Sequence, residues 1–246
     1  MRRSEVKNIA LGAPIEYGYF GIQKRMEIIL RNTDLKNANL LDAGCGNGAQ
    51  TLEYLKHVKK CTAVDIEGQR LEEFRGQVQA RGIDNCEIKQ MDLTSLDLAD
   101  EAFDVVTCIE TLEHIAPQEK ALDEMYRVLK KGGMLVLSVP NKWWFFETHG
   151  AKLPLLPWNR VPFFSWLPKK VHDKYAYARI YTKRMILGLV QNHGFKVYNS
   201  EYMMPPLDKI RIDPLRDILR SLLALLEKHR LMPRVFGVSI FVFARK

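Results

Sequence analysis

The stretch Cys108-Ile-Glu-Thr-Leu-Glu-His114 places two carboxylates and an imidazole within five residues. On a helical turn Glu110 shares a face with Glu113 and His114, because residues three and four apart are neighbours. Carboxylate and imidazole groups gathered in this way can hold a divalent cation. Without a cation, His114 is the preferred general base, since the unperturbed pKa of histidine lies near neutrality. We therefore predict that Glu110, Glu113 and His114 are catalytic residues.

A glycine-rich stretch could bind a cofactor. In Asn39-Leu-Leu-Asp-Ala-Gly-Cys-Gly-Asn-Gly48 an apolar run ends at Asp42, and Gly44, Gly46 and Gly48 follow at alternate positions. Glycines allow a tight turn and a close approach of ligand to backbone. The spacing differs from the Gly-x-Gly-x-x-Gly of dinucleotide binders, and a carboxylate here would repel a pyrophosphate but accept hydrogen bonds from an ammonium group. The turn therefore predicts a zwitterionic ligand.

Two further carboxylates follow the next two predicted strands. Asp65 ends the apolar run Cys61-Thr-Ala-Val-Asp-Ile66, at the position where a carboxylate meets ribose hydroxyls in nucleotide-binding units. Asp92 follows the run Glu87-Ile-Lys-Gln-Met, where a polar side chain can accept a hydrogen bond from an adenine amino group. Asp42, Asp65 and Asp92 are thus expected at the carboxyl edge of one sheet.

The elements that would position these residues alternate along the chain. Helical patterns over Ala49–His57, Gly68–Arg81 and the residues after Pro117 separate short apolar runs, as a doubly wound parallel sheet requires. Later strands are predicted at Phe103–Ile109, Met134–Val139, Phe195–Tyr202 and Val235–Ala244, with a helix over Thr182–His193. The fold class is α/β, Rossmann-like.

At this point the chain resembles the class I S-adenosylmethionine-dependent methyltransferases. Asp42-Ala-Gly-Cys-Gly-Asn-Gly48 is similar to the first family motif, and Val64-Asp65 and Met91-Asp92-Leu93 to the ribose and adenine positions. The resemblance implies a seven-stranded sheet of order 3-2-1-4-5-7-6 with strand 7 antiparallel, and S-adenosyl-L-methionine as cofactor. It also implies a set of cofactor-binding residues: Asp42, Gly44, Cys45, Gly46, Gly48, Asp65, Ile66, Met91, Asp92, Leu93 and Ile109.

Glu110-x-x-Glu113-His114 also resembles the motif of two metal-dependent branches of this family. These are the ubiquinone-biosynthesis O-methyltransferases, to which the chain is nearest, and the small-RNA 2′-O-methyltransferases. Both supply a further histidine well downstream, and His172 stands at a matching distance. The resemblance thus implies a site for a divalent metal, Mg²⁺ or a softer ion, at Glu110, Glu113, His114 and His172. The alternative is a metal-free enzyme, since Leu-Glu-His at this position also occurs in methyltransferases without a metal.

Length and composition fit one methyltransferase domain over residues 1–246. We divide it into an N-terminal cap (1–36), a cofactor-binding core (37–140), a substrate-lid insertion (141–181) and a C-terminal sheet half (182–246). No apolar run reaches the ~18 residues of a membrane span, and the N-terminus lacks the apolar core of a secretory signal. Four widely spaced cysteines suggest buried free thiols in a reducing compartment. The prediction is a cytoplasmic protein, with membrane association left open.

The insertion after the fifth strand combines Trp, Phe and Pro residues without a repeat. Long irregular insertions of this kind are commonly lids or binding loops. We predict that Trp143, Glu147, His149 and His172 in it, and Tyr17 near the N-terminus, contact the substrate. A later helix starting at Asp213 carries a leucine-rich stripe, which we expect to cover the sheet.

Charge is unevenly distributed. Up to Pro140 the chain has 18 Lys and Arg against 22 Asp and Glu, a net charge of −4; from Asn141 it has 19 against 7, a net charge of +12. Basic surface with aromatic residues suits a membrane interface, so we favour O-methylation of a small-molecule or lipid-linked acceptor, such as a prenylated phenol, at a membrane surface. RNA is the main alternative, and a soluble small molecule remains open. The sequence does not predict the oligomeric state.

Overall fold

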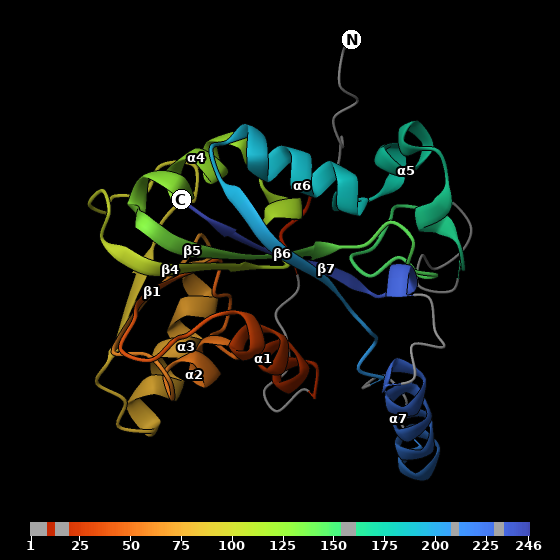
Figure 1. Cartoon of the computed structure of the whole chain (residues 1–246), viewed down its shortest axis with the longest axis horizontal. Coiled ribbons are helices and arrows are strands. Elements are labelled where there is room, and N and C mark those ends of the chain that lie inside the picture. The colour runs from red at the N-terminus through yellow and green to blue at the C-terminus, as the bar shows by residue number, and fades with distance from the viewer. Residues whose placement is uncertain (1–8, 13–19, 154–160, 208–211, 229–233) are drawn as a thin grey trace.

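The computed structural model describes residues 9–12, 20–153, 161–207, 212–228 and 234–246. Within these residues seven strands form one sheet in the order β3-β2-β1-β4-β5-β7-β6 (Figure 1). The predicted strand order is therefore confirmed. The strands are β1 (Asn39–Ala43), β2 (Lys60–Asp65), β3 (Cys86–Gln90), β4 (Phe103–Ile109), β5 (Leu129–Pro140), β6 (Lys196–Met203) and β7 (Ser239–Arg245).

Strand direction sets where the chemistry can lie. β1 pairs in parallel with β2 and β4, and β4 pairs in parallel with β5, so these strands end at one edge. β7 runs antiparallel to both β5 and β6, as expected. The register places Ile109 at the end of β4 opposite Ser138 near the end of β5. Residues that directly follow β1, β2 and β4 therefore meet at the carboxyl edge of the sheet.

Helices cover both faces of the sheet (Figure 1). On one face lie α1 (Phe20–Asn32), α2 (Thr51–Tyr54) and α3 (Gly68–Ala80); on the other lie α4 (Gln118–Val128) and α6 (Lys183–Asn192). Apolar side chains fix this layering because neighbouring strand residues point to opposite faces. Leu41 and Val106 enter the core under α4 and α6, whereas Leu40 and Val105 enter the core under α1, α2 and α3.

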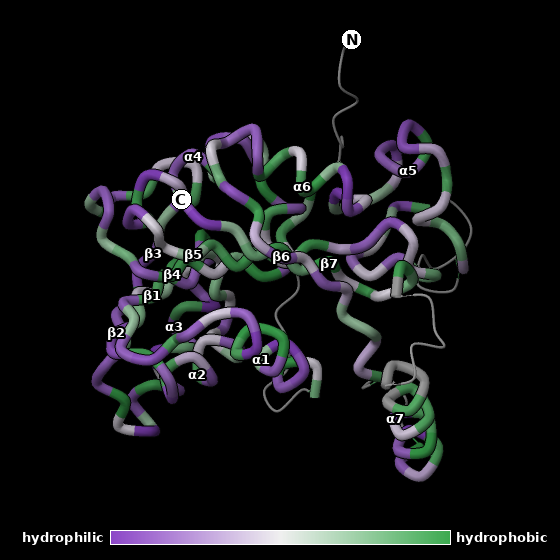
Figure 2. The backbone as a smooth tube through the Cα atoms, viewed as in Figure 1, coloured by the Kyte–Doolittle hydropathy of each residue, from purple (hydrophilic) through white to green (hydrophobic). Residues whose placement is uncertain are grey.

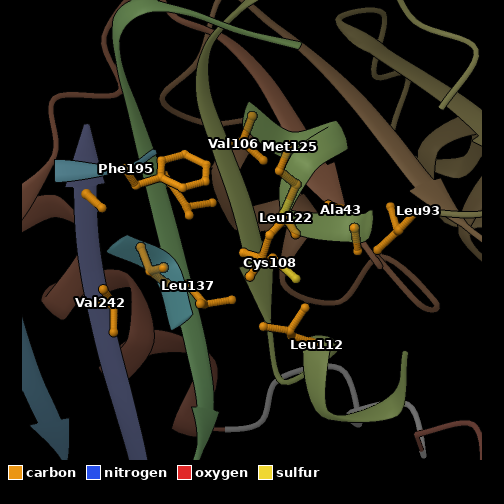
Figure 3. Close-up of a cluster of buried hydrophobic side chains, with 14 of the residues drawn as sticks. Ala43, Leu93, Val106, Cys108, Leu112, Leu122, Met125, Leu137, Phe195 and Val242 are labelled. Atoms are coloured by element: carbon orange, nitrogen blue, oxygen red, sulfur yellow. The ribbon is translucent and has the colours of Figure 1, made fainter. Parts of the chain in front are cut away.

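The core under α4 joins the helix to the strands that position the site (Figure 3). Leu122 and Met125 from α4 are fully buried against Val106 and Cys108 of β4. Each such side chain contributes roughly 1.5–3 kcal/mol by leaving water. Leu112, which follows β4, is buried in the same cluster and anchors the loop that carries the predicted catalytic residues.

Three predicted elements differ in extent, and one of them is the last strand, which was predicted from Val235 but begins at Ser239. The helix predicted over Ala49–His57 is limited to the four residues of α2. The fifth strand, predicted from Met134, begins already at Leu129, where it pairs with Phe103 before a register shift between Phe103 and Val105. Main-chain pairing with β4 thus extends the strand through residues that the sequence pattern marks as a turn.

The expectation that the last helix covers the sheet is wrong. Helix α7 (Asp213–Lys228) projects from the body of the molecule beyond β6 and β7 (Figure 1), and its apolar residues Leu215, Ile218, Leu222 and Leu225 are exposed. The reason is that the outer strand is already covered, because α1 and α6 both contact β6. Among the described helices, none is long and apolar enough to cross a membrane.

Candidate functional site

The three glycines after β1 have different structural roles. A Cβ on Gly44, at φ +87°, would lie 2.2 Å from the Thr111 methyl carbon, so this glycine lets the turn touch the loop after β4. A Cβ on Gly48, at φ +79°, would lie 2.0 Å from the Phe74 ring, so this glycine allows α3 to pack closely. Only Gly46 faces open space. It is therefore the glycine best placed for contact with a ligand.

Asp42 is buried at the end of β1. Its two carboxylate oxygens accept hydrogen bonds from the hydroxyls of Thr51, at 2.6 Å, and Thr107, at 2.9 Å. Burial raises the pKa of Asp42 to about 6, although both hydroxyl bonds work against this rise. The carboxylate still has lone pairs for a ligand ammonium group or a bridging water. Its role as a cofactor-binding residue stays a prediction.

Burial of Asp42 predicts a pH dependence of stability. Below about pH 4 both the folded and unfolded chains hold the proton, whereas between pH 3.8 and about 6 only the folded chain keeps it. The free energy of unfolding should therefore fall by about 3 kcal/mol across this window and level off above it. Urea unfolding of the wild type and Asp42→Asn at a series of pH values tests this. Parallel profiles for the two proteins would contradict the assignment.

The other predicted cofactor carboxylates also lie at the carboxyl edge. Asp65 accepts the N–H groups of Gly46, at 2.8 Å, and Glu67, at 3.0 Å, and so ties the glycine turn to β2. Asp92 is exposed and accepts hydrogen bonds from the backbone and hydroxyl of Thr94. The remaining predicted residues surround these positions: Cys45 and Leu93 are buried, Met91 and Ile109 are partly buried, and Ile66 is half exposed.

The chain turns sharply where β4 ends. Glu110 has a φ of +51°, a left-handed conformation that costs a non-glycine residue about 1–3 kcal/mol. Its side chain is fixed by the Ser138 hydroxyl, which donates to Glu110 Oε1 at 2.6 Å. The chain then forms the short 3-10 helix η1 (Leu112–His114). The turn directs Glu113 and His114 inward beside the glycine loop.

Glu113 is fully buried, yet neither of its carboxylate oxygens has a hydrogen-bond partner among the described residues. His149 Nε2 lies 3.1 Å from Glu113 Oε1, which is an ion-pair distance, but without hydrogen-bond alignment. Burial raises the pKa of Glu113, and the charge of Glu110 adds to the rise, while His149 opposes it. A buried carboxylate left this way is costly unless a ligand completes its surroundings.

His114 has one ring nitrogen bound and one unpaired. Its Nδ1 lies 2.6 Å from the carbonyl oxygen of Ala10, which can only accept, so Nδ1 carries the proton. Its Nε2 therefore holds a lone pair, and within the described residues it has no hydrogen-bond partner. Burial lowers the pKa of His114, which keeps the ring neutral. Residues 9–12 lie against this ring, since a Cβ on Gly12 would be 3.0 Å from it.

His149, from the insertion, completes the cluster. Its ring centroid lies 5.0 Å from that of His114, and its Nε2 lies 3.9 Å from Glu110 Oε2. Burial alone would lower the pKa of His149, but Glu113, with the charges of Glu110 and Glu147, raises it to about 8. Ligand atoms of Glu113, His114 and His149 all lie within 4.8 Å of one another, close enough to hold a metal ion.

The predicted ligand set is corrected at two positions: Glu110 is not in the group whose ligand atoms lie within 4.8 Å of one another, and His172 does not join the cluster. The Nε2 of His172 lies 2.8 Å from Glu147 Oε2, and its Nδ1 lies 3.4 Å from Asp173. Burial would lower the pKa of His172, but these two carboxylates raise it. The other oxygen of Glu147 accepts the backbone N–H of His149 at 3.0 Å. Glu147 thus links His172 to the backbone of His149. His149, and not His172, is the histidine of the insertion that lies next to Glu113.

Removing His172 should destabilise the protein strongly. His172→Phe would leave Glu147 as a buried carboxylate without its partner, which typically costs about 3–5 kcal/mol. His193 provides a matched control, because it pairs with the exposed carboxylate of Asp123 at 2.6 Å. Exposed pairs contribute about 1 kcal/mol or less, so His193→Phe should change little. Urea unfolding compares the two variants; equal losses would contradict a buried Glu147–His172 pair.

The other predicted substrate residues lie apart from the cluster or outside the described residues. Trp143 is exposed, and its ring contacts Trp166 at a centroid distance of 6.2 Å and Lys142 at 5.9 Å. It belongs to an aromatic group in which Phe145 stacks on Phe236 at 5.2 Å. Tyr17 falls in residues 13–19, which lie outside the described residues. Its contact with substrate, like that of Trp143, stays a prediction.

Sequence analysis missed the hydroxyl partners and the N-terminal contact of this site. Thr107 and Ser138 are buried inside strands, where their alternation with apolar residues was the only available signal. Ala10 gives no signal at all, because its contribution to His114 is a backbone carbonyl. His149 was identified as a substrate residue, but not as a neighbour of Glu113.

A known domain family matches the part of the chain that builds this site. The model of the methyltransferase domain family matches residues 41–137. This range starts in β1, includes the glycine turn and Glu110–His114, and ends in β5. Residues 41–137 therefore match a methyltransferase domain, and the sheet has the strand order expected for the class I S-adenosylmethionine-dependent fold.

Relatives agree with this class. The ubiquinone biosynthesis O-methyltransferase of Coxiella burnetii is 27% identical over 158 residues, which span 63% of this chain and 63% of the relative. A methyltransferase structure from Mesorhizobium loti, described as S-adenosylmethionine dependent, has a TM-score of 0.63 at 16% identity and covers 93% of this chain and 99% of its own. The cyclase SpnF shares the fold at 21% identity, with a TM-score of 0.61 over 91% of this chain and 81% of its own. The fold alone therefore does not specify the reaction.

Proposed function

We propose that this chain transfers the methyl group of S-adenosylmethionine to a hydroxyl oxygen of a hydrophobic acceptor presented at a membrane surface. One observation carries the proposal: Glu113 and Nε2 of His114 lie together beside the glycine turn, buried and without hydrogen-bond partners in the part of the chain that the structure describes. The link to the turn is direct, because Thr111 Oγ1 donates to the carbonyl oxygen of Gly44 at 3.3 Å. A proton acceptor thus lies next to the proposed cofactor site.

The chemistry requires alignment and removal of one proton. The acceptor oxygen attacks the methyl carbon, a C–O bond forms, and the C–S bond breaks so that its electron pair returns to sulfur. The sulfonium is already an activated leaving group, so the protein needs only to orient the acceptor and take its proton. Without a bound metal, His114 would be the general base, because its Nε2 is neutral and has no hydrogen-bond partner among the described residues; with a metal, this lone pair would be a ligand instead. Glu113 would stabilise the imidazolium that forms.

The same residues fit a divalent cation. Glu113 Oε1 lies 3.1 Å from His149 Nε2 and 3.9 Å from His114 Nε2, and His149 Nε2 lies 3.9 Å from Glu110 Oε2. A bound cation would lower the pKa of the acceptor hydroxyl and orient it. Two imidazoles in the donor set favour ions such as Mn²⁺, Fe²⁺ or Zn²⁺ over Mg²⁺. We include this metal in the proposal, with His149 in place of His172.

The acceptor class rests on two lines of support. The Coxiella burnetii relative is named for ubiquinone biosynthesis and for O-methylation. The insertion that contributes His149 also exposes aromatic side chains, including Trp143, Phe146 and Phe163. Aromatic residues of this kind are frequent at membrane interfaces. A hydrophobic acceptor at a membrane surface fits both observations.

Transfer of labelled methyl groups tests the proposal. Purified protein is incubated with labelled S-adenosylmethionine and separated lipid and RNA fractions of bacterial cells. Each incubation is run with chelator and with chelator followed by Mg²⁺, Mn²⁺ or Zn²⁺. We expect label in the lipid fraction, lost with chelator and restored best by Mn²⁺ or Zn²⁺. Label in RNA would contradict the lipid acceptor and identify RNA as the acceptor. Activity that chelator does not change would contradict the metal but not the role of His114 as general base.

A further inference from the structure

Helix α7 has an unusual orientation. Its apolar residues Leu215, Ile218, Leu222 and Leu225 are spaced by three, four and three residues and so form one stripe. An apolar stripe normally faces the core, but Ile218 is 65% exposed and Leu222 is 49% exposed. No described helix or strand packs extensively along α7. Figure 2 shows α7 projecting from the body with hydrophobic and hydrophilic positions along it.

Arg220 connects α7 to the body of the molecule, whereas the ion pair of Arg216 lies within the helix. The Arg220 guanidinium lies 4.2 Å from the Phe20 ring centroid, and its Nε donates to the carbonyl oxygen of Pro206 at 3.0 Å. Arg216 pairs with Asp213 at 2.8 Å. The Arg216 and Arg220 side chains are only 24% and 23% exposed, less than the apolar stripe. The two arginine side chains are thus less exposed than the four residues of the stripe, and Leu219 and Leu223 are partly buried with them.

The exposed stripe lies at the same end of the molecule as the exposed part of the insertion. The next described element after α7 is η4 (Arg234–Phe236). Its residue Phe236 stacks on Phe145 of the insertion. Both α7 and the insertion extend from the right-hand end of the sheet in Figure 1. Apolar side chains exposed there come from three separate segments: Trp143, Phe146, Phe163, Leu167, Leu215, Ile218, Leu222, Leu225 and Val235.

We infer that the apolar face of α7 docks in the interface of a membrane that contains anionic lipid. Charge favours this occupant through the surrounding chain, because residues 141–246 have a net charge of +12, although α7 itself carries three acidic and three basic residues. Two copies brought together through this half would repel each other, whereas anionic headgroups attract it. A bilayer also accepts apolar side chains from several segments without a matched partner surface. An amphipathic helix of this kind lies in the plane of the interface.

This inference extends the proposed function, on which it rests only for the location of the acceptor. Docking through α7 would hold the protein at the surface where a lipid-linked hydroxyl is presented. The test below measures binding without turnover, so its failure is distinguishable from a failure of methyl transfer. Loss of docking with retained methylation of a detergent-solubilised acceptor would overturn the inference and leave the proposed function intact.

Vesicle sedimentation with a matched pair of variants tests the docking helix. Leu222→Glu places a carboxylate on the stripe, and Met185→Glu makes the same change on α6, at a side chain of similar exposure, 41% against 49%. The full chain is mixed with vesicles of phosphatidylcholine alone or with an equal part of phosphatidylglycerol. We expect binding to the mixed vesicles, reduced about tenfold or more by Leu222→Glu because a carboxylate opposes insertion, and retained by Met185→Glu.

Two results would overturn the docking helix. Equal binding by the wild type and Leu222→Glu would show that α7 does not enter the interface. A concentration-dependent dimer in sedimentation velocity that Leu222→Glu dissociates would assign the stripe to a second copy. Both variants change half-exposed side chains, and thermal unfolding confirms that each is folded before binding is measured.

Discussion

Glu113→Gln is expected to lower kcat/KM for methyl transfer by at least about 100-fold. Glutamine keeps the size of Glu113 but removes the charge that would stabilise an imidazolium at His114 or hold a cation, and contributions of this kind are about 10²–10⁴-fold. Initial rates with the acceptor identified by the labelling experiment give kcat and KM separately. The loss should appear mainly in kcat, because Glu113 acts on the reacting groups rather than on cofactor binding.

Glu87→Gln is the matched control for this substitution. Glu87 lies on β3 and forms ion pairs with Lys60 at 3.2 Å and Lys89 at 2.8 Å, away from the predicted cluster. Exposed pairs contribute little, so this variant should keep wild-type rates. If Glu113→Gln retains activity within about tenfold of the control, the cluster is not the catalytic centre. Restoration of its activity by excess Mn²⁺ would separate a metal-binding role from a purely electrostatic one.

The strands of the cofactor half could be predicted locally, because each is a short apolar run followed by a turn and a helix. The order of the strands in the sheet came from the resemblance to the methyltransferase family, and the structure confirms it. The position of α7 could not be predicted in this way. Its stripe has the spacing of a core-facing helix, but the outer strand is already covered by α1 and α6. Whether a helix can pack on β6 depends on which other helices already cover that strand, and the sequence of α7 does not contain this information.

The candidate site also has a part that the sequence predicts and a part that it does not. Glu110, Glu113 and His114 lie within five residues, so local spacing alone brings them together. The fourth residue of the cluster, His149, comes from the insertion. The distance along the sequence does not show whether His149 or His172 reaches Glu113. Glu147 decides it, because one oxygen binds His172 and the other binds the backbone of His149. The buried pair of Glu147 and His172 keeps His172 out of the site, and the spacing of these residues in the sequence does not predict this pair.

The glycine turn offers a prediction that separates cofactor binding from backbone strain. Gly46 and Gly82 have φ values of +56° and +61°, and a Cβ on either would meet no atom within 4 Å. Gly46 lies at the carboxyl edge after β1, whereas Gly82 lies in the loop after α3, at the opposite edge before β3. Alanine at either position should cost about 1–2 kcal/mol of stability through the left-handed backbone alone.

Only Gly46→Ala should weaken the binding of S-adenosylmethionine, by about 10- to 100-fold, because its new methyl group enters the space that the cofactor is proposed to occupy. Calorimetric titration with the cofactor measures the dissociation constant, and urea unfolding confirms that both variants lose similar stability. Equal weakening by Gly82→Ala would assign the effect to strain in the backbone. Wild-type affinity in Gly46→Ala would mean that the cofactor does not contact this turn. The prediction that Asp42 and Asp65 bind the cofactor would then lose its support, because it depends on their position beside the turn.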